Sequence, residues 1–290
     1  MTCRVEHKNE PMKKAVKIYL LLGLLTLVLS TPLISQNKMR IISLAPSLTH
    51  DLVIMGVQDQ IVGITNYCEN NADKSISIVA SAIDVNIERV VSLKPDLVIA
   101  TSLTNPEVQQ SLKNFGIKLI YFPLPKSFDE INSQFLELGK LLDKEAVAEE
   151  IIQQEKAKVA SLKKMIPLGS NPKIFVQIGI KPLFCVIPNT FLDDYITFSG
   201  GENATNDLKN GSISRESVLL RNPDVIVLVT MGNVGEEEKQ NWMNYSSVNA
   251  VKNKQIFIVD SDIACSPTPD HFTQTLELFI NFLYKNIKNE

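Results

Sequence analysis

The chain has 290 residues, of which 44% are hydrophobic and 21% charged, and its formal net charge is −3. This is the composition of an ordinary globular protein, and the length allows one large domain or two of about 100–150 residues. The slightly acidic balance excludes the basic surface that nucleic-acid binding requires.

The first 35 residues differ from the rest of the chain. A basic stretch at 12–17 precedes an apolar run at 18–30. This order predicts a signal peptide, residues 1–35, cleaved at about 30–36. An uncleaved anchor is the alternative, but the apolar run is short for a membrane span of about 20 residues. The start codon is either Met1 or Met12.

The remainder of the chain is expected to be exported in soluble form. No cysteine lies between Cys3 and Cys68, so the apolar run is not followed by a lipid-attachment site. Residues 1–35 hold five of the 29 basic and two of the 32 acidic residues, which leaves a net charge of −6 on the rest.

Strands and helices alternate along the first half. Strands are predicted at 40–44, 60–64, 97–100 and 117–122, and helices at 47–55, 87–93 and 106–115, with Ser47 or Thr49 as a helix cap. This alternation predicts α/β lobes with a parallel-rich sheet flanked by helices, the first spanning 38–140.

A Gly- and Pro-free segment at 141–166 follows, with apolar residues near one helical face. We expect one rigid connecting helix, since about 24 residues make a rod of roughly 36 Å. A second lobe at 171–290 repeats the scheme. Its strands are predicted at 173–178, 225–229 and 255–260, and its helices at 191–198, 214–220, 242–251 and 272–287.

One phrase occurs twice. Residues 88–99 read ERVVSLKPDLVI, and residues 216–227 read ESVLLRNPDVIV. A repeat at 128 residues indicates two similar lobes rather than a solenoid, whose period is about 20–50 residues. Two lobes imply a ligand cleft between them, and the repeat pairs Glu88 with Glu216.

Several phrases in this order resemble the substrate-binding proteins of ATP-binding-cassette (ABC) importers that carry metal chelates, namely cobalamin, ferric siderophores and haem. The similarity is greatest to the cobalamin-binding branch. The matching phrases lie at 40–49 (RIISLAPSLT), 61–68 (IVGITNYC), 86–96 (NIERVVSLKPD), 200–203 (GGEN) and 214–216 (SRE).

The resemblance implies a periplasmic receptor, not an enzyme, with no cofactor of its own and no metal site. It implies a monomer that captures a chelate and delivers it to the importer's membrane subunits. Glu88 and Glu216 match the glutamates by which such proteins dock on transporter arginines, an interaction suited to carboxylates. Helix N-terminal acids favoured by the helix dipole are the simpler reading.

The resemblance also implies cleft residues at the strand ends of both lobes. They are Tyr67, Cys68 and Thr101 in the first lobe, and Phe184, Cys185, Asp262, Cys265 and Ser266 in the second. Tyr67 and Phe184 match aromatic residues that pack on the corrin ring, although each also suits an ordinary core.

The cleft departs from the cobalamin branch at several positions. The only tryptophan, Trp242, lies outside the matching phrases, and Ser81 and Thr101 stand where bulky aromatics are expected. Asp270 follows Pro269 where an arginine is expected, and His50 replaces a glutamate. No cleft arginine is expected to meet an anionic siderophore. A corrinoid is therefore favoured, with a siderophore or haem as the alternative.

Three cysteines remain after the predicted cleavage. A Cys185–Cys265 disulfide, three unpaired thiols or ligation of a soft metal are the alternatives. An exported enzyme with a cysteine nucleophile is a remote alternative, because no motif links a histidine base to a thiol. A sensory or scavenging protein without a transporter would differ from a transport receptor only at Glu88 and Glu216.

Overall fold

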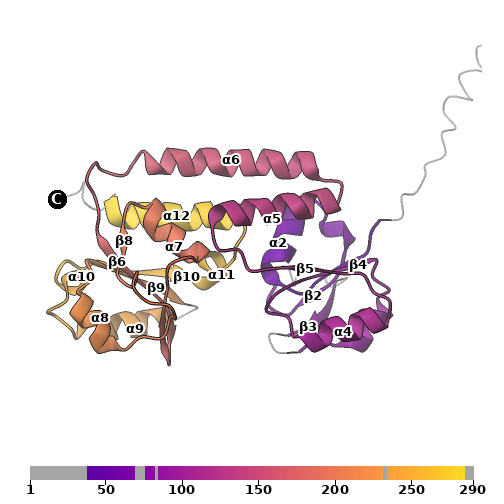
Figure 1. Ribbon diagram of the computed structural model, residues 1–290, viewed down its shortest axis with the longest axis horizontal. Coiled ribbons are helices and arrows are strands. Elements are labelled where there is room, and N and C mark those ends of the chain that lie inside the picture. The colour runs from indigo at the N-terminus through magenta and orange to yellow at the C-terminus, as the bar shows by residue number, and fades with distance from the viewer. Residues whose placement is uncertain (1–37, 69–75, 82–83, 231–233, 285–290) are drawn as a thin grey trace, which may run out of the picture. The chain divides into compact units, whose positions relative to one another are not determined.

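The computed structural model describes residues 38–68, 76–81, 84–230 and 234–284 (Figure 1). The predicted signal peptide at 1–35 lies outside these ranges. Within them, no helix is long and apolar enough to cross a membrane.

The N-terminal lobe is built on a five-stranded sheet in which every pairing is parallel. The strands lie in the order β3-β2-β1-β4-β5, so the chain changes direction across the sheet between β1 and β4. Their bounds are β1 (Ile41–Ser43), β2 (Ile61–Thr65), β3 (Ser77–Ala80), β4 (Leu97–Thr101) and β5 (Leu119–Phe122). The helices of this lobe are α2 (Pro46–Ile54), a short 3₁₀ turn at Gln58–Gln60, α3 (Ile87–Ser92) and α4 (Pro106–Asn114).

Alternate residues of the central strands enter two different cores. Ile41 packs with α2 on one face, whereas its neighbour Ile42 packs with α3 and α4 on the other. Successive side chains on a strand point to opposite faces, so strands with no polar face are the expected result of helices on both sides.

The C-terminal lobe has the strand order β10-β9-β6-β7, with β7 antiparallel to β6 and a short β8 also paired to β6. The strands are β6 (Lys173–Ile180), β7 (Leu183–Cys185), β8 (Glu202–Asn203), β9 (Val225–Thr230) and β10 (Ile256–Asp260). The helices are α7 (Phe191–Phe198), α8 (Arg215–Arg221), α9 (Val234–Met243), α10 (Asn249–Lys252), α11 (Ser261–Ala264) and α12 (Pro269–Tyr284).

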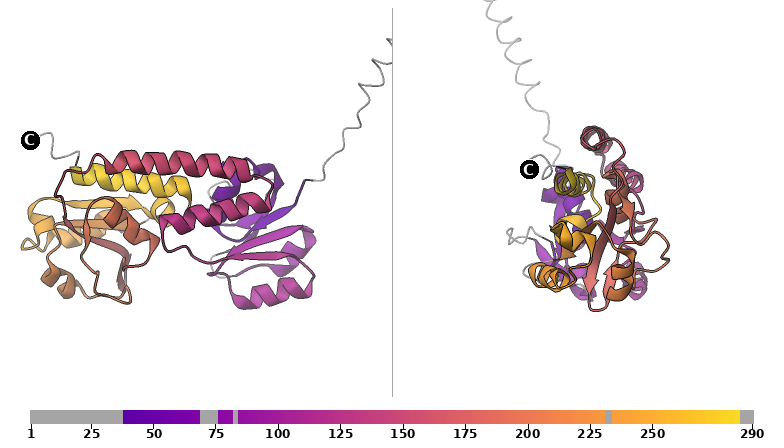
Figure 2. Two further views of the ribbon diagram at one scale, coloured as in Figure 1. Left: turned by 45° about the horizontal axis from the view of Figure 1, so that its top comes forward. Right: turned by 90° about the vertical axis from the view of Figure 1, so that its left-hand side faces the viewer.

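Helices α5 (Phe128–Leu141) and α6 (Glu145–Lys163) join the lobes, and α6 lies beside both α5 and α12 (Figures 1 and 2). Each contributes to both cores. Phe128 at the start of α5 and Val159 near the end of α6 belong to a C-terminal core, whereas Phe135 and Ile152 belong to an N-terminal core. Because two helices are anchored at both ends, the connection resists bending.

The connecting helix is shorter than the predicted 141–166. Its 19 residues make a rod of about 28 Å, and α5, which the sequence analysis missed, runs beside it. Asp143 adopts a positive φ of 56° between the two helices. Gly139 allows them to meet closely, because a Cβ there would lie 2.6 Å from the Cβ of Ala148.

Two local predictions were wrong. Neither Ser47 nor Thr49 caps α2, which begins at Pro46 after Ala45 with no side-chain cap. The predicted helix at 242–251 is instead the end of α9 and the separate α10.

The Pro-Asp pair of the repeated phrase makes the same kind of hydrogen bond in both lobes. Asp96 accepts a hydrogen bond from the backbone N–H of Arg40 at 2.8 Å, and Asp224 accepts one from that of Lys173 at 3.0 Å. The residues before the two prolines, Lys94 and Asn222, share a φ of 46°. The Pro-Asp pair thus ties the strand that follows each helix to the start of the lobe's first strand.

Candidate ligand-binding site

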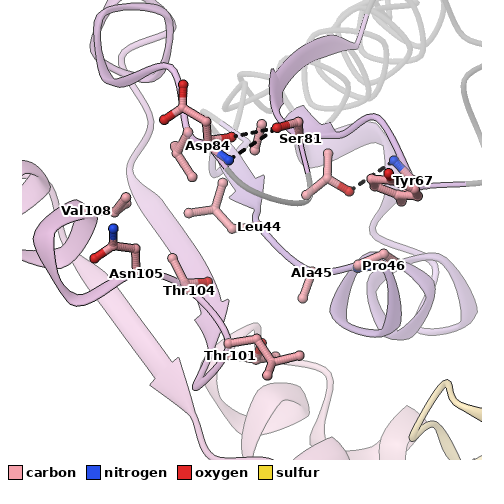
Figure 3. Close-up of a pocket in the computed structure, with 14 residues that line it drawn as sticks. Leu44, Ala45, Pro46, Tyr67, Ser81, Asp84, Thr101, Thr104, Asn105 and Val108 are labelled. Carbon is pink, nitrogen blue, oxygen red and sulfur yellow. Dashed lines mark hydrogen bonds between the residues drawn. The ribbon is translucent and has the colours of Figure 1, made fainter. Parts of the chain in front are cut away.

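A pocket of about 350 Å³ lies at the carboxyl end of the N-terminal sheet (Figure 3). The pocket is lined by Leu44 and Ala45, which follow β1, and by Thr101 at the end of β4. These are the two strands between which the chain changes direction, and ligands bind at such points in open α/β sheets. The remaining lining residues are Pro46, Thr65, Tyr67, Ala80, Ser81, Asp84, Val85, Leu103, Thr104, Asn105 and Val108.

The lining is mixed: seven of the fourteen residues are apolar, and the other seven are polar or charged. Among the residues that the structure describes, Asp84 is the only charged one in the lining, and no arginine or lysine contributes. The two most exposed large side chains in the lining are Tyr67, at 57% exposure, and Leu103, at 78%. An exposed aromatic ring beside a pocket offers a flat apolar surface on which a planar ligand can pack.

Hydrogen bonds between buried hydroxyl and thiol groups support the loop that carries Tyr67. The hydroxyl of Thr49 donates to Ser43 Oγ at 2.8 Å and lies 3.2 Å from Cys68 Sγ. The backbone N–H of Tyr67 donates to Thr65 Oγ1 at 3.3 Å. These buried contacts fix the ends of β1 and β2, so Tyr67 projects from a rigid base.

A smaller pocket of about 50 Å³ adjoins the first and is lined by residues of both lobes. The N-terminal lobe supplies His50 and Cys68, and the C-terminal lobe supplies Ser266 and His271. Tyr67 and Pro46 line both pockets, which places the smaller pocket beside the larger one.

A hydrogen bond crosses between the lobes at this point. His50 Nε2 lies 2.7 Å from Asp270 Oδ2, and the ring of His50 stacks on that of His271 with centroids 4.0 Å apart. Burial opposes ionisation of Asp270, but the hydrogen bond from His50 prevails and lowers its pKa to about 2. Burial, aided by the charge of Asp270, raises the pKa of Asp51 well above its usual range.

The predicted cleft residues fall into two groups. Tyr67 and Thr101 line the larger pocket, and Tyr67, Cys68 and Ser266 line the smaller one. The other predicted residues line neither pocket. They are Phe184, which is 40% exposed on β7, the exposed Asp262 and Cys265, and Cys185, which is only 2% exposed in a C-terminal core.

Of the alternatives for the three cysteines, the Cys185–Cys265 disulfide is not formed in the structure, where Cys68, Cys185 and Cys265 are free thiols. Cys185 Sγ donates to the carbonyl of Gly211 at 3.4 Å. Cys265 is exposed just after α11. A core position for one thiol and an exposed loop for the other explain why they do not pair.

Glu88 and Glu216 occupy the same place in α3 and α8. Each is exposed and is the second residue of its helix, after a capping side chain: Asn86 accepts from the N–H of Arg89, and Ser214 accepts from that of Ser217. The equivalence expected from the repeat is therefore present in three dimensions.

Sequence reasoning missed most of the loop residues that line the larger pocket. Leu103, Thr104 and Asn105 carry no motif and were not singled out. The one usable signal was their position directly after a predicted strand, where a parallel sheet presents its ligand site. His50 and Asp270 are 220 positions apart in the sequence, so no local spacing of residues could predict their contact.

Comparison with known proteins agrees with this architecture. Residues 41–263 match the family described as periplasmic binding protein. The vitamin B12-binding protein of Yersinia pestis is 31% identical over 222 residues, which cover 75% of this chain and 76% of that protein.

Solved structures give the same result. A possible iron-binding (periplasmic solute-binding) protein from Staphylococcus epidermidis is 28% identical with a TM-score of 0.76, covering 84% of this chain and 98% of that one. The vitamin B12-binding protein BtuF of Vibrio cholerae, at 24% identity and a TM-score of 0.72 over 87% and 98% of the two chains, shows the shared fold. The chain thus belongs to the periplasmic binding protein family, whose members are substrate-binding proteins rather than enzymes.

Proposed function

We propose that the chain is the periplasmic receptor of an ABC importer and that its ligand is a metal chelate of the corrinoid class. It acts as a soluble monomer after removal of the signal peptide. The relatives that are 31% identical are vitamin B12-binding proteins, and the pocket at the carboxyl end of the N-terminal sheet is the proposed ligand site.

The observation that carries this proposal is a pocket whose described lining holds no arginine or lysine, beside the exposed ring of Tyr67. Cobalamin bears amide side chains around a flat macrocycle, and the hydroxyl and amide groups of Thr101, Thr104 and Asn105 suit hydrogen bonding to amides. Tyr67 suits packing on the ring. A corrinoid is larger than about 350 Å³, so the pocket would hold one part of it.

Ferric siderophores and haem form the second candidate class. The 28% identity to a possible iron-binding protein favours it. Both ligands commonly carry negative charge, and within the described part of the chain the one charged residue that lines the larger pocket is Asp84, itself negative. Burying an anion without a cationic partner is costly, so the corrinoid is the better fit.

The proposed transporter contacts are Glu88 and Glu216. A two-lobed body with a stiff connection needs one anchor on each lobe to register on a two-fold symmetric partner. Their equal helix positions and exposure support this role. A scavenging protein without a transporter would have no use for such a pair of glutamates, so a transport receptor is the better fit.

The ligand is tested by incubating the purified protein separately with cobalamin, haem and a ferric siderophore, followed by desalting. We expect cobalamin to be retained at one molecule per chain, as measured by native mass spectrometry and by its visible absorption. Retention of haem or the ferric chelate alone would replace the corrinoid by the second class. Retention of none of the three would contradict chelate binding.

The docking role is tested by uptake of labelled cobalamin in cells that express the native importer. We expect the double variant Glu88→Ala/Glu216→Ala to abolish uptake while its affinity for cobalamin is unchanged. Glu107→Ala/Glu236→Ala is the matched control, because these exposed glutamates lie in the first turns of α4 and α9. Full uptake by the first variant would contradict docking through this pair.

A further inference from the structure

His50, Asp270 and His271 form a cluster that the proposed function does not use. One ring nitrogen of each histidine and one carboxylate oxygen of Asp270 lie within 4.8 Å of one another. His50 comes from α2 of the N-terminal lobe, and the other two residues come from the first turn of α12 in the C-terminal lobe. We propose that these three side chains bind a divalent first-row transition-metal ion, which links the two lobes.

The distances suit such an ion. Zinc bonds to nitrogen and oxygen at about 2.0–2.2 Å, so its ligand atoms lie roughly 3–4 Å apart. The cluster is already near that size. The rings of His50 and His271 are stacked with an interplanar angle of 24°, so one ring must turn before both nitrogens face a single ion. His50 and Asp270 are partly exposed, with 26% and 22% of their side-chain surface accessible, which leaves room for the His50 ring to turn.

The donor set identifies the class of ion. Two imidazoles and one carboxylate suit zinc, iron(II) and related ions, whereas magnesium and calcium prefer oxygen ligands. One carboxylate charge balances half the charge of a divalent ion, and imidazole binds in its neutral form.

The carboxylate is held in place by a second contact. Thr268, which is fully buried, donates its hydroxyl to Asp270 Oδ1 at 2.8 Å, on the oxygen opposite the one that faces His50. A hydrogen bond of this kind orients a metal-binding carboxylate and tunes its affinity. Asp270 therefore presents Oδ2 toward the histidines in a fixed direction.

The cluster also leaves space for a further ligand. His50 and His271 line the smaller pocket, whose volume of about 50 Å³ has room for a water molecule. Three protein ligands with one open position are typical of metal sites that exchange a water for another donor. The pocket also contains Cys68, but its thiol contacts Thr49 and Thr65, so we assign it no bond to the ion.

The test is zinc binding by the purified protein after treatment with a chelator. Zinc is titrated in competition with a chromogenic chelator, and cobalt(II) is used separately for its visible absorption. We expect one ion per chain and a cobalt spectrum without a thiolate charge-transfer band. The variants His50→Ala, Asp270→Asn and His271→Ala should each lower zinc affinity by at least about tenfold.

Two controls keep this test independent of folding. Asp129→Asn removes an exposed acid from the first turn of α5 and should leave zinc affinity unchanged, as should Cys68→Ser. Saturating zinc should raise the melting temperature of the wild type, and should raise that of a folded His271→Gln variant much less.

Absence of zinc binding to the wild type would overturn the proposal and leave only the hydrogen bond between His50 and Asp270. Zinc binding that survives both His50→Ala and His271→Ala would also overturn it. The outcome is separate from the ligand assignment, because zinc binding and cobalamin retention are measured independently.

Discussion

The two lobes share their scaffold and differ at the carboxyl ends of their strands. In the N-terminal lobe, β1, β2 and β4 end around a pocket of about 350 Å³. In the C-terminal lobe, β6 turns back into the antiparallel β7. The buried side chain of Gln177 on β6 donates a hydrogen bond to Glu238 and accepts one from Trp242. The comparison shows that the Pro-Asp phrase marks the common scaffold, whereas the ligand-facing edge is specific to each lobe.

The largest expected effect concerns the connection that both lobes share. Phe128 of α5 is 4% exposed and stacks on Phe272 of α12, with ring centroids 4.4 Å apart. Its backbone N–H also donates to Asp194 at 2.7 Å. Phe128→Ala should lower the free energy of unfolding in urea by about 3–5 kcal/mol.

Phe115→Ala is the control for this prediction, because Phe115 is 61% exposed and should change stability by no more than about 0.5 kcal/mol. A loss below about 1 kcal/mol for Phe128→Ala would mean that α5 does not anchor the C-terminal core.

The next effect concerns the buried polar network around Glu238 in the C-terminal lobe. Glu238 is 1% exposed and lies 2.7 Å from Arg215. Burial opposes its ionisation, but hydrogen bonds from Gln177, Arg215 and Asn241 lower the pKa of Glu238. Glu238→Gln should cost about 1.5–3 kcal/mol at neutral pH.

The pH dependence follows from the sign of this shift. The pKa of Glu238 is lower in the native state than its value of 4.5 in the unfolded chain. Its contribution to stability is therefore complete above pH 4.5 and is lost as the pH falls through the native pKa. The stability gap between wild type and Glu238→Gln should therefore narrow below pH 4.5. The exposed neighbour Glu237→Gln serves as the control, and a gap that widens in acid would contradict the assignment.

A smaller effect compares the repeated aspartates directly. The carboxylate of Asp224 accepts hydrogen bonds from the backbone N–H of Lys173 and from the side chain of Asn249. The carboxylate of Asp96 is exposed and accepts one from the backbone N–H of Arg40. We expect Asp224→Ala to cost about 1–2 kcal/mol and Asp96→Ala about 0.5–1 kcal/mol in urea unfolding. A larger cost for Asp96→Ala than for Asp224→Ala would contradict the stronger contribution assigned to Asp224.

The sequence was sufficient for the scaffold because local patterns determine it. Apolar strands such as Leu97–Thr101 and capped helices such as α3 follow from short-range chemistry. The repeat then placed Glu88 and Glu216 in matching positions. The break between α9, which ends at Met243, and α10, which begins at Asn249, was missed although Asn244, Ser246 and Ser247 are turn-forming residues.

The site was less predictable because it depends on contacts between distant segments. Tyr67 and Thr101 were found at strand ends, but Cys185, at a similar place on β7, points into the core. Because β7 runs antiparallel to β6, its last residue, Cys185, pairs with Gln177 in the middle of β6 and lies away from that strand's carboxyl end. Neither composition nor spacing indicated this antiparallel return. The stack of His50 on His271 likewise exists only once both lobes are folded.

The most direct test of the account compares one aromatic residue from each lobe. Cobalamin affinity is measured by titration calorimetry for Tyr67→Ala and Phe184→Ala, which remove side chains from exposed positions. We expect about a tenfold loss, or about 1.4 kcal/mol, for Tyr67→Ala and less than about a twofold loss for Phe184→Ala. Wild-type affinity in Tyr67→Ala, or a larger loss in Phe184→Ala, would contradict a ligand site at the edge of the N-terminal sheet.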